Sequence, residues 1–473
     1  MTASTSSSGS KTHRSAEEIG RTGAGPRPLP ELGSQKAAAD LSTVDTTLPN
    51  GLRVIAVRRA TVPMVELRLR VPFADPSGSS AGSQHSAIAE ILANTVLTGT
   101  RSRSRVRIDT ELALVGGELD AVVDPERLSI TGNALATGLD TVLDVLRDVL
   151  TSASYPAEEV ERERARLVER IALARSQPNV IAREALQTLL YGDHPYAKEM
   201  PEADEVANVS REDVVALHGK ALLPRGSVLV VVGDVEPSEA VTRIGEALAA
   251  WQGDGEAVQL PPLPAVSGGD VKLVHRAGAV QSQIRLAAQA IPRTDPRYPA
   301  LQLANLVYGG FFSSRLVENI REDKGYTYSA RSHPEFTVHG ATLLIDADTA
   351  SDVTAAALLE TRYELARLGL VPPSQSEVDT ARSYAVGTLL TSTSSQSGLA
   401  SFLVNLVALG LGIDWLVAHP QRLAAVTAEE VAAAALEFFA PANFTGVLVG
   451  DAEQLKPKLA ALGGVDLGEV SSR

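Results

Sequence analysis

Arg321 and Tyr328 are the two residues of this chain whose types and spacing best suit chemistry on a carbonyl group. A guanidinium and a phenol both donate hydrogen bonds. Tyr328 follows Arg321 by seven positions, and Gly325 lies between them. If the chain turns tightly at Gly325, both side chains can point to one place. They would then stabilise the oxyanion that develops when a carbonyl is attacked.

The sequence around this pair predicts a helix, a glycine stop and a strand. An apolar stripe at helical spacing precedes Arg321 and consists of Leu316, Val317 and Ile320. Ser313 or Ser314 can cap the first turn, and Gly325 suits the left-handed residue after a helix. We therefore predict that the helix ends shortly after Arg321 and that Tyr328 projects from the strand. The alternative is an exposed arginine and a packed tyrosine in an ordinary α/β unit.

The stretch SRLVENIREDKGYTYS, residues 314–329, resembles the arginine–tyrosine motif of the pitrilysin/insulinase (inverzincin) zinc peptidases. In that family the two side chains hydrogen-bond the scissile carbonyl, while a zinc ion in the N-terminal half activates water. The resemblance implies that Arg321 and Tyr328 are catalytic residues. It also extends to the glycine-containing approach NLVYGGFFSSRL, where Gly309 and Gly310 would bind substrate, with a plain turn as their simpler role.

The metal motif of the family has a counterpart in this chain that lacks its ligands. Active relatives carry H-x-x-E-H on a helix that ends in F-x-G-T. The segment HSAIAEILANTVLTGT, aligned on its last two residues, puts Glu90, Ala93 and Asn94 at the three motif positions. The segment ERERARLVERI puts Arg170 at the position of the further glutamate ligand. A guanidinium has no lone pair for zinc and repels it, so we expect no metal in this chain.

Glu90 and Asn94 are four residues apart, which puts them on one face of a helix. We hypothesise that Glu90 and Arg170 form an ion pair across the vacated metal site, because opposite charges there would satisfy each other. The alternative is two unrelated residues that face the solvent.

An internal repeat indicates two homologous halves. The segments VSREDVVALHGKALLPRGSVLVVVGD, residues 209–234, and VTAEEVAAAALEFFAPANFTGVLVGD, residues 426–451, align without a gap. Each begins with a hydroxyl residue three positions before an acid, which is typical of a capped helix start. Each then continues through a proline to an apolar strand that ends in Gly-Asp. Such self-similarity implies duplicated units.

These signals predict the domain organisation and the fold class. We expect a disordered tail at 1–41, a peptidase-like half without its zinc motif at 42–254, and a Pro/Gly-rich linker at 255–269. A second half with the arginine–tyrosine motif follows at 270–465, and a tail at 466–473. Strands at 51–57 and 65–71 and a helix at 157–174 favour an α+β fold. The resemblance implies two halves, each a mainly antiparallel sheet backed by helices, which together form half of a peptide chamber.

Composition narrows the setting in which the chain works. Its net charge of −14 argues against binding to nucleic acid or to an anionic membrane surface. The absence of cysteine excludes disulfides and thiolate metal sites. The longest apolar runs have the length of strands, and the N-terminus has no apolar central region. We therefore expect a cytoplasmic protein without a membrane partner.

Together these observations favour the interpretation that the chain is a zinc-free subunit of a heterodimeric metallopeptidase. By resemblance, a homologous partner subunit would carry H-x-x-E-H and zinc, and this chain, inactive alone, would lend Arg321 and Tyr328 to the carbonyl of an unfolded peptide substrate. The alternative is a non-catalytic structural or peptide-binding pseudopeptidase subunit, in which the two residues serve no hydrolysis.

Overall fold

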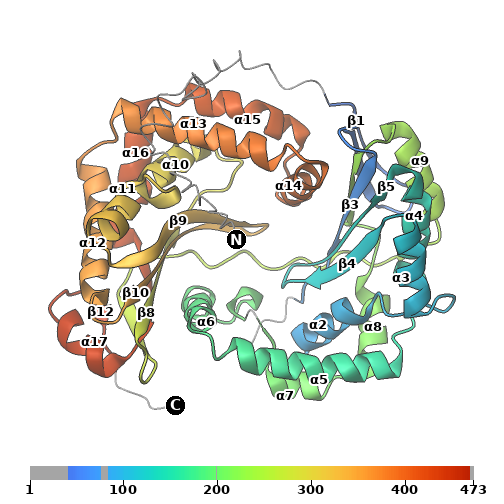
Figure 1. Cartoon of the computed structure of the whole chain (residues 1–473), viewed down its shortest axis with the longest axis horizontal. Coiled ribbons are helices and arrows are strands. Elements are labelled where there is room, and N and C mark those ends of the chain that lie inside the picture. The colour runs from blue at the N-terminus through green and yellow to red at the C-terminus, as the bar shows by residue number, and fades with distance from the viewer. Residues whose placement is uncertain (1–40, 76–83, 199, 469–473) are drawn as a thin grey trace, which may run out of the picture. The chain divides into compact units, whose positions relative to one another are not determined.

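A computed structural model describes residues 41–75, 84–198 and 200–468. The predicted tail 1–41 lies outside these residues apart from Leu41, and the predicted tail 466–473 is described only as far as Gly468. Two six-stranded sheets organise the described residues, and each is backed by helices (Figure 1). The predicted fold class, with two sheets that are mainly antiparallel and covered by helices, is confirmed.

The first sheet has the order β1-β2-β6-β3-β5-β4. Its strands are β1 (Thr43–Thr47), β2 (Arg53–Arg58), β3 (Met64–Pro72), β4 (Glu118–Val123), β5 (Arg127–Leu135) and β6 (Val228–Gly233). Only β2 and β6 are parallel neighbours. The helices of this half are α2 (His85–Thr95), α3 (Arg105–Leu114), α4 (Leu139–Ser152), α5 (Ala157–Ala174), α6 (Pro178–Tyr191), α7 (Ala203–Ala207), α8 (Arg211–Ala221) and α9 (Pro237–Ala247). The strands and the helix predicted for this half are therefore present.

The second sheet has the order β12-β7-β11-β8-β10-β9. Its strands are β7 (Val271–His275), β8 (Gln281–Gln289), β9 (Thr327–Thr337), β10 (Gly340–Ala350), β11 (Thr445–Gly450) and β12 (Val465–Asp466). Its helices are α10 (Tyr298–Asn305), α11 (Arg315–Val317), α12 (Thr354–Leu370), α13 (Gln375–Ser392), α14 (Gln396–Ala408), α15 (Ile413–Ala425), α16 (Ala428–Phe438) and α17 (Ala452–Leu459), with π-helical turns η3 (Leu306–Gly310) and η4 (Glu318–Asp323). Residues 255–269, between the two sheets in sequence, contain no helix or strand.

The repeat in the sequence is also a repeat of structure. Helix α8 begins with a capping box of Ser210 and Asp213, and α16 begins with one of Thr427 and Glu430. The strands that follow, β6 and β11, take the same place in the two sheets. Each pairs in parallel with one neighbour, β2 or β7, and antiparallel with the other, β3 or β8. The two halves are therefore homologous in topology, as predicted.

One helix of each half packs on the sheet of the other half. Helix α6 of the first half packs on β8 and β11, where Leu186 contacts the cluster of Ala287 and Val447. Helix α14 of the second half packs on β3 and β6, where Leu403 joins a cluster with Val230 and Val232. Strand β6 is therefore buried on both faces, which explains its unbroken apolar sequence.

Among the described helices no single one is long and apolar enough to cross a membrane. Helices α14 and α15, bent by 95° relative to each other, together have the length and apolar composition of a span.

Candidate functional site

The segment that carries Arg321 is wound as a short α-helix and a π-helical turn. Helix α11 continues directly into η4, which contains Arg321. Gly325 has a φ of +62° and its N–H donates to the carbonyl of Arg321 at 3.1 Å, so it ends the helix as predicted. The apolar stripe is buried in the core of the second half. The predicted serine cap is wrong, because Ser314 occupies the N-cap position but its hydroxyl makes no capping hydrogen bond.

Tyr328 lies at a β-bulge that turns its side chain outward. Strands β9 and β10 pair regularly until the register shifts between Asp348 and Thr349, so that Thr327 lies opposite Thr349. In a regular ladder Tyr328 would take that position and would face the helices. The bulge instead buries Thr327 and leaves Tyr328 96% exposed. A bulge beside a site commonly re-aims a side chain in this way.

The hydroxyl of Thr327 holds this bulge. It donates to the carbonyl of Asp348 at 2.5 Å and accepts from the N–H of Ser329 at 2.9 Å. The two bonds satisfy backbone groups that the shifted ladder leaves without a strand partner. The outward orientation of Tyr328 is therefore fixed by its neighbour rather than by its own contacts.

The guanidinium of Arg321 is partly exposed and lightly held. Its Nε lies 3.3 Å from Oε1 of Glu322, and its Cζ lies 4.8 Å from the centre of the Phe312 ring. Phe312 is itself 58% exposed. Exposed contacts of this kind are weak, so the guanidinium can exchange them for another acceptor. The structure puts Arg321 and Tyr328 on either side of the turn at Gly325.

An ion pair between the buried Arg315 and the partly exposed Glu377 anchors the segment, and the sequence analysis did not predict it. Arg315 is buried; its Nε and Nη2 donate to the two carboxylate oxygens of Glu377 at 2.7 and 3.0 Å, and its Nη1 donates to the carbonyl of Val371 at 2.9 Å. Burial acts to raise the pKa of Glu377, but hydrogen bonds from Arg315 and Ser374 outweigh it and lower the pKa to about 2. A two-pronged arginine–carboxylate pair gives a defined geometry. In the sequence, the only sign of this ion pair was that Arg315 lies within the motif that resembles the family's.

Gly309 and Gly310 lie in η3, at the end of α10. A Cβ on Gly309 would lie 2.9 Å from Oγ of Ser332 on β9, and a Cβ on Gly310 would lie 2.9 Å from Nδ2 of Asn305. Both glycines therefore permit close packing within this chain, rather than a plain turn. Their predicted contact with substrate stays a prediction.

The degenerate metal-site positions converge on one place. Glu90 and Asn94 lie on α2 and Arg170 lies on α5, which packs against α2. Nη2 of Arg170 is 3.5 Å from Oε2 of Glu90, so the hypothesised ion pair is confirmed. Asn94 donates to Glu90 through its Nδ2, at 2.7 Å to the carbonyl and 3.5 Å to Oε2. Ala93 is buried in the core.

A second carboxylate that the sequence reading missed completes this cluster. Glu163 lies on α5, seven residues before Arg170, and is buried. Its Oε1 lies 3.7 Å from Nη2 of Arg170. Burial raises the pKa of Glu90, and the charge of Arg170 offsets this only in part. The guanidinium of Arg170 contacts both carboxylates, and its fixed positive charge would repel zinc, so these residues do not fit a zinc ion. Among the described residues no group of three or more His, Cys, Asp or Glu is arranged to hold a metal ion.

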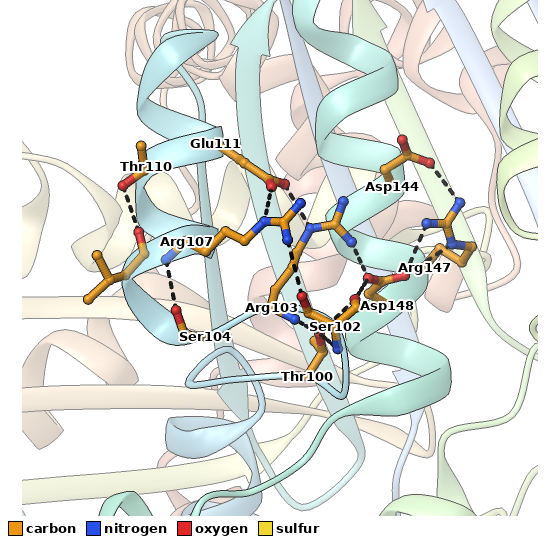
Figure 2. Close-up of polar contacts among 11 residues, drawn as sticks. Thr100, Ser102, Arg103, Ser104, Arg107, Thr110, Glu111, Asp144, Arg147 and Asp148 are labelled. Atoms are coloured by element: carbon orange, nitrogen blue, oxygen red, sulfur yellow. Dashed lines mark hydrogen bonds and ion pairs between the residues drawn. The ribbon is translucent and has the colours of Figure 1, made fainter.

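The segment after α2 is fixed by an ionic network (Figure 2). Figure 2 shows Arg103 between Glu111 and Asp148, and its Nε donates to Glu111 at 2.7 Å while its Nη1 contacts Asp148. Asp148 also accepts from the hydroxyl of Ser102 at 2.6 Å and pairs with Arg147 at 3.0 Å. Burial acts to raise the pKa of Asp148, but these bonds and the charge of Arg103 hold it below its usual value. The network ties α3 and α4 to the segment that follows α2.

A cavity of about 810 Å³ lies between parts of the two halves. It is lined by Glu90, by residues 123–127 after the edge strand β4, by α6, by residues 333–338 at the end of β9, and by Phe402 of α14. Neither Arg321 nor Tyr328 lines it. Of the first-half positions only Glu90 lines this cavity, and the second-half pair lies outside it.

Comparison with known proteins gives the class of this molecule. The model of the insulinase family, peptidase family M16, matches residues 60–203, and the model described as the peptidase M16 inactive domain matches residues 208–384. The chain belongs to this family.

Relatives and solved structures agree with the family match. An uncharacterized zinc protease of Mycobacterium leprae is 28% identical over 306 residues, which cover 63% of this chain and 67% of the relative. One of Streptomyces coelicolor is 27% identical over 338 residues, covering 68% and 71%. The crystal structure of a peptidase M16 inactive domain from Pseudomonas fluorescens superposes with a TM-score of 0.78 at 22% identity, covering 87% of this chain and 98% of that chain. A protease from Helicobacter pylori also gives 0.78, at 19% identity and 87% and 99% coverage, so it shares the fold.

Proposed function

We propose that this chain is the zinc-free subunit of a two-subunit peptidase and that it supplies Arg321 and Tyr328 to a peptide carbonyl held at the zinc of a homologous partner. In this role the guanidinium and the phenol donate hydrogen bonds to the carbonyl oxygen as it gains negative charge. Each donor at such an oxygen is commonly worth about 3 kcal/mol, or roughly 10²–10³ in rate. That magnitude is large enough to make a metal-free subunit necessary for hydrolysis.

One observation carries the proposal: Tyr328 is held almost fully exposed by a bulge whose Thr327 hydroxyl bridges to Asp348. A large aromatic side chain loses apolar burial in that position. Such an arrangement is explained if the phenol must meet a group from outside its own chain. Arg321, on the other side of Gly325, has only contacts that are easily exchanged.

The residues at the positions aligned with the family's zinc ligands support the proposal that the zinc lies in the partner chain. Arg170 is a fixed cation in contact with Glu90, and a zinc ion there would meet that charge at short range. Water activation must then come from a partner chain with H-x-x-E-H. The substrate we propose is an unfolded peptide, and the compartment we propose is the cytoplasm.

The second candidate is a non-catalytic, peptide-binding subunit. The cavity between the halves favours it, since this cavity contains Glu90 and the end of β9 but neither Arg321 nor Tyr328. Under this alternative a peptide would bind the chain without any contribution from the outward-facing pair.

Complementation separates the two candidates. The chain and a zinc-bearing homologue encoded in the same genome are purified separately and together, and hydrolysis of an unfolded, internally quenched peptide is measured. The proposal expects little turnover from either chain alone and at least about a hundredfold more from the mixture. Full activity of the zinc-bearing chain by itself would reject the proposal and leave the peptide-binding alternative.

A further inference from the structure

A second cavity lies in the second half and contains none of the predicted site residues. It has a volume of about 840 Å³ and is bounded by the loop before α10 and by helices α15 and α16. This volume falls in the range of small-molecule sites, roughly 300–1,000 Å³. The side chains on which the argument depends are Arg293, Tyr298, Trp415, His419 and Arg422.

Three clustered rings form one wall. The imidazole of His419 stacks on Trp415, with centroids 4.2 Å apart and planes at 17°. Tyr298 lies beside this pair, with its centroid 5.6 Å from that of His419 and 6.3 Å from that of Trp415. All three side chains are buried in the fold, and all three contribute to the cavity lining. A stacked wall of this kind favours a planar ligand over a bulky one.

Two guanidinium groups flank the indole of Trp415. The Cζ atoms of Arg293 and Arg422 each lie 5.9 Å from its ring centre. Among the described residues neither arginine has a carboxylate within 4.0 Å, and Nε of Arg293 is buried without a hydrogen-bond partner. Arg297 of the same cavity differs, because it pairs with Asp295 and Glu437 at 2.8 Å each.

The acids of the cavity do not neutralise these two cations. Glu437 is engaged by Arg297, and Glu430 accepts from the N–H of Thr427 at 2.8 Å in the capping box of α16. The two guanidinium groups beside Trp415 therefore have no carboxylate within 4.0 Å among the described residues and can attract an anion.

His419 adds a buried acceptor without a donor. It is 2% exposed, and its Nε2 lies 2.8 Å from Oε1 of Gln302, an acceptor, so Nε2 carries the proton. Burial, followed by the charges of Arg293 and Arg422, lowers the pKa of His419 to about 4, so the ring is neutral at pH 7. Its Nδ1 then presents a lone pair, and it has no partner among the described residues. Buried polar atoms in native proteins are normally paired.

We propose that this cavity binds a small planar aromatic carboxylate. Its carboxylate lies against Arg293 and Arg422, its ring packs on the wall of Trp415, and a hydroxyl group of the ligand donates to Nδ1 of His419. This binding site is separate from the proposed peptidase function, and neither depends on the other.

Calorimetric titration with 6-hydroxy-2-naphthoate tests the proposal, with 2-naphthol as the neutral comparison. We expect one molecule per chain, an affinity at least about tenfold above that for 2-naphthol, and weaker binding at high salt. The chain has two tryptophans, so in a Trp251→Phe background the fluorescence of Trp415 locates the ligand. Saturable quenching in that background is expected.

Arg422→Gln supplies the decisive variant, because Arg422 is exposed and its loss leaves the core intact. We expect it to weaken naphthoate binding by at least about fivefold while 2-naphthol binding stays unchanged. Lys272→Gln, which removes an exposed cation outside the cavity, is the control and should change neither. No binding at millimolar naphthoate, equal affinity for 2-naphthol, or an unchanged affinity in Arg422→Gln would each overturn the proposal.

Discussion

Nη2 of Arg170 lies 3.5 Å from Oε2 of Glu90, and the resemblance aligns both residues with zinc-ligand positions of active family members. Oε1 of Glu163 lies 3.7 Å from the same Nη2 atom. One guanidinium is therefore in contact with two carboxylates at these positions.

Removal of Arg170 should destabilise the fold in a pH-dependent way. Arg170→Met leaves Glu90 and Glu163 close together without their cation, and we expect a loss of about 1 kcal/mol at pH 7.5, small because Arg170 is half exposed. The pKa of Glu90 is already raised in the fold and should rise further, so the penalty shrinks as protonation removes the charge at lower pH. Urea unfolding at pH 7.5 and pH 5 measures this. An equal deficit at both values would contradict the account, and Arg162→Met on the same helix is the control.

Introducing the family's zinc ligands at positions 90, 94 and 170 should create a zinc site. The triple variant Glu90→His, Asn94→His, Arg170→Glu puts two imidazoles four residues apart on α2 and a carboxylate on α5. We expect about one zinc per chain by elemental analysis after dialysis. The variant Asn94→His alone should bind much less. No gain of zinc in the triple variant would show that these positions do not share a coordination geometry.

The anchor of the arginine–tyrosine segment should weaken in acid. The pKa of Glu377 is about 2 in the fold and about 4.3 when unfolded, so its contribution is fully present above the unfolded value and is lost as the pH falls towards 2. Glu377→Gln should cost about 1 kcal/mol at pH 7, because solvent screens a carboxylate that is 36% exposed. Its unfolding free energy should also depend less on pH between 6 and 3 than that of the wild type. Glu429→Gln, an exposed change on α16, should leave the pH slope unaltered.

The bulge beside Tyr328 should depend on one hydroxyl. Thr327→Val keeps the shape of the side chain but removes the bonds to Asp348 and Ser329, at a cost of about 1 kcal/mol. We expect faster amide exchange at Ser329 and a lower rate of hydrolysis by the two-chain complex with unchanged assembly. Thr380→Val, whose hydroxyl bonds only to its own helix, is the matched control. Wild-type turnover in Thr327→Val would separate the bulge from function.

Short-range sequence patterns and the family resemblance predicted much of the fold and the contact between Glu90 and Arg170 in the first half. The capping boxes at Ser210 and Thr427 could be predicted because each is built from residues three apart. The Glu90–Arg170 contact could be predicted because the family motif fixes which helix faces meet. The pairing of Arg315 with Glu377 could not, since 62 residues separate them and no periodicity links them.

Other features depend on strand register and on contacts between distant segments, which a local sequence pattern does not show. Alternation of apolar and polar residues gives no sign of the register shift at Thr349, so the orientation of Tyr328 required the structure. The same holds for the exchange of α6 and α14 between the sheets, which depends on the packing of whole halves. The predicted serine cap is absent because the buried hydroxyl of Ser314 makes no hydrogen bond to the first turn.

The turnover number of the reconstituted complex, measured with Arg321→Ala and Tyr328→Phe in this chain, tests the central claim most directly. Arg162→Ala and Tyr363→Phe, exposed residues of the same types, serve as controls. We predict that kcat falls by roughly 10²–10³ in each site variant, with KM and subunit affinity nearly unchanged and both controls at wild-type rates. Wild-type kcat in Arg321→Ala and Tyr328→Phe would contradict the account.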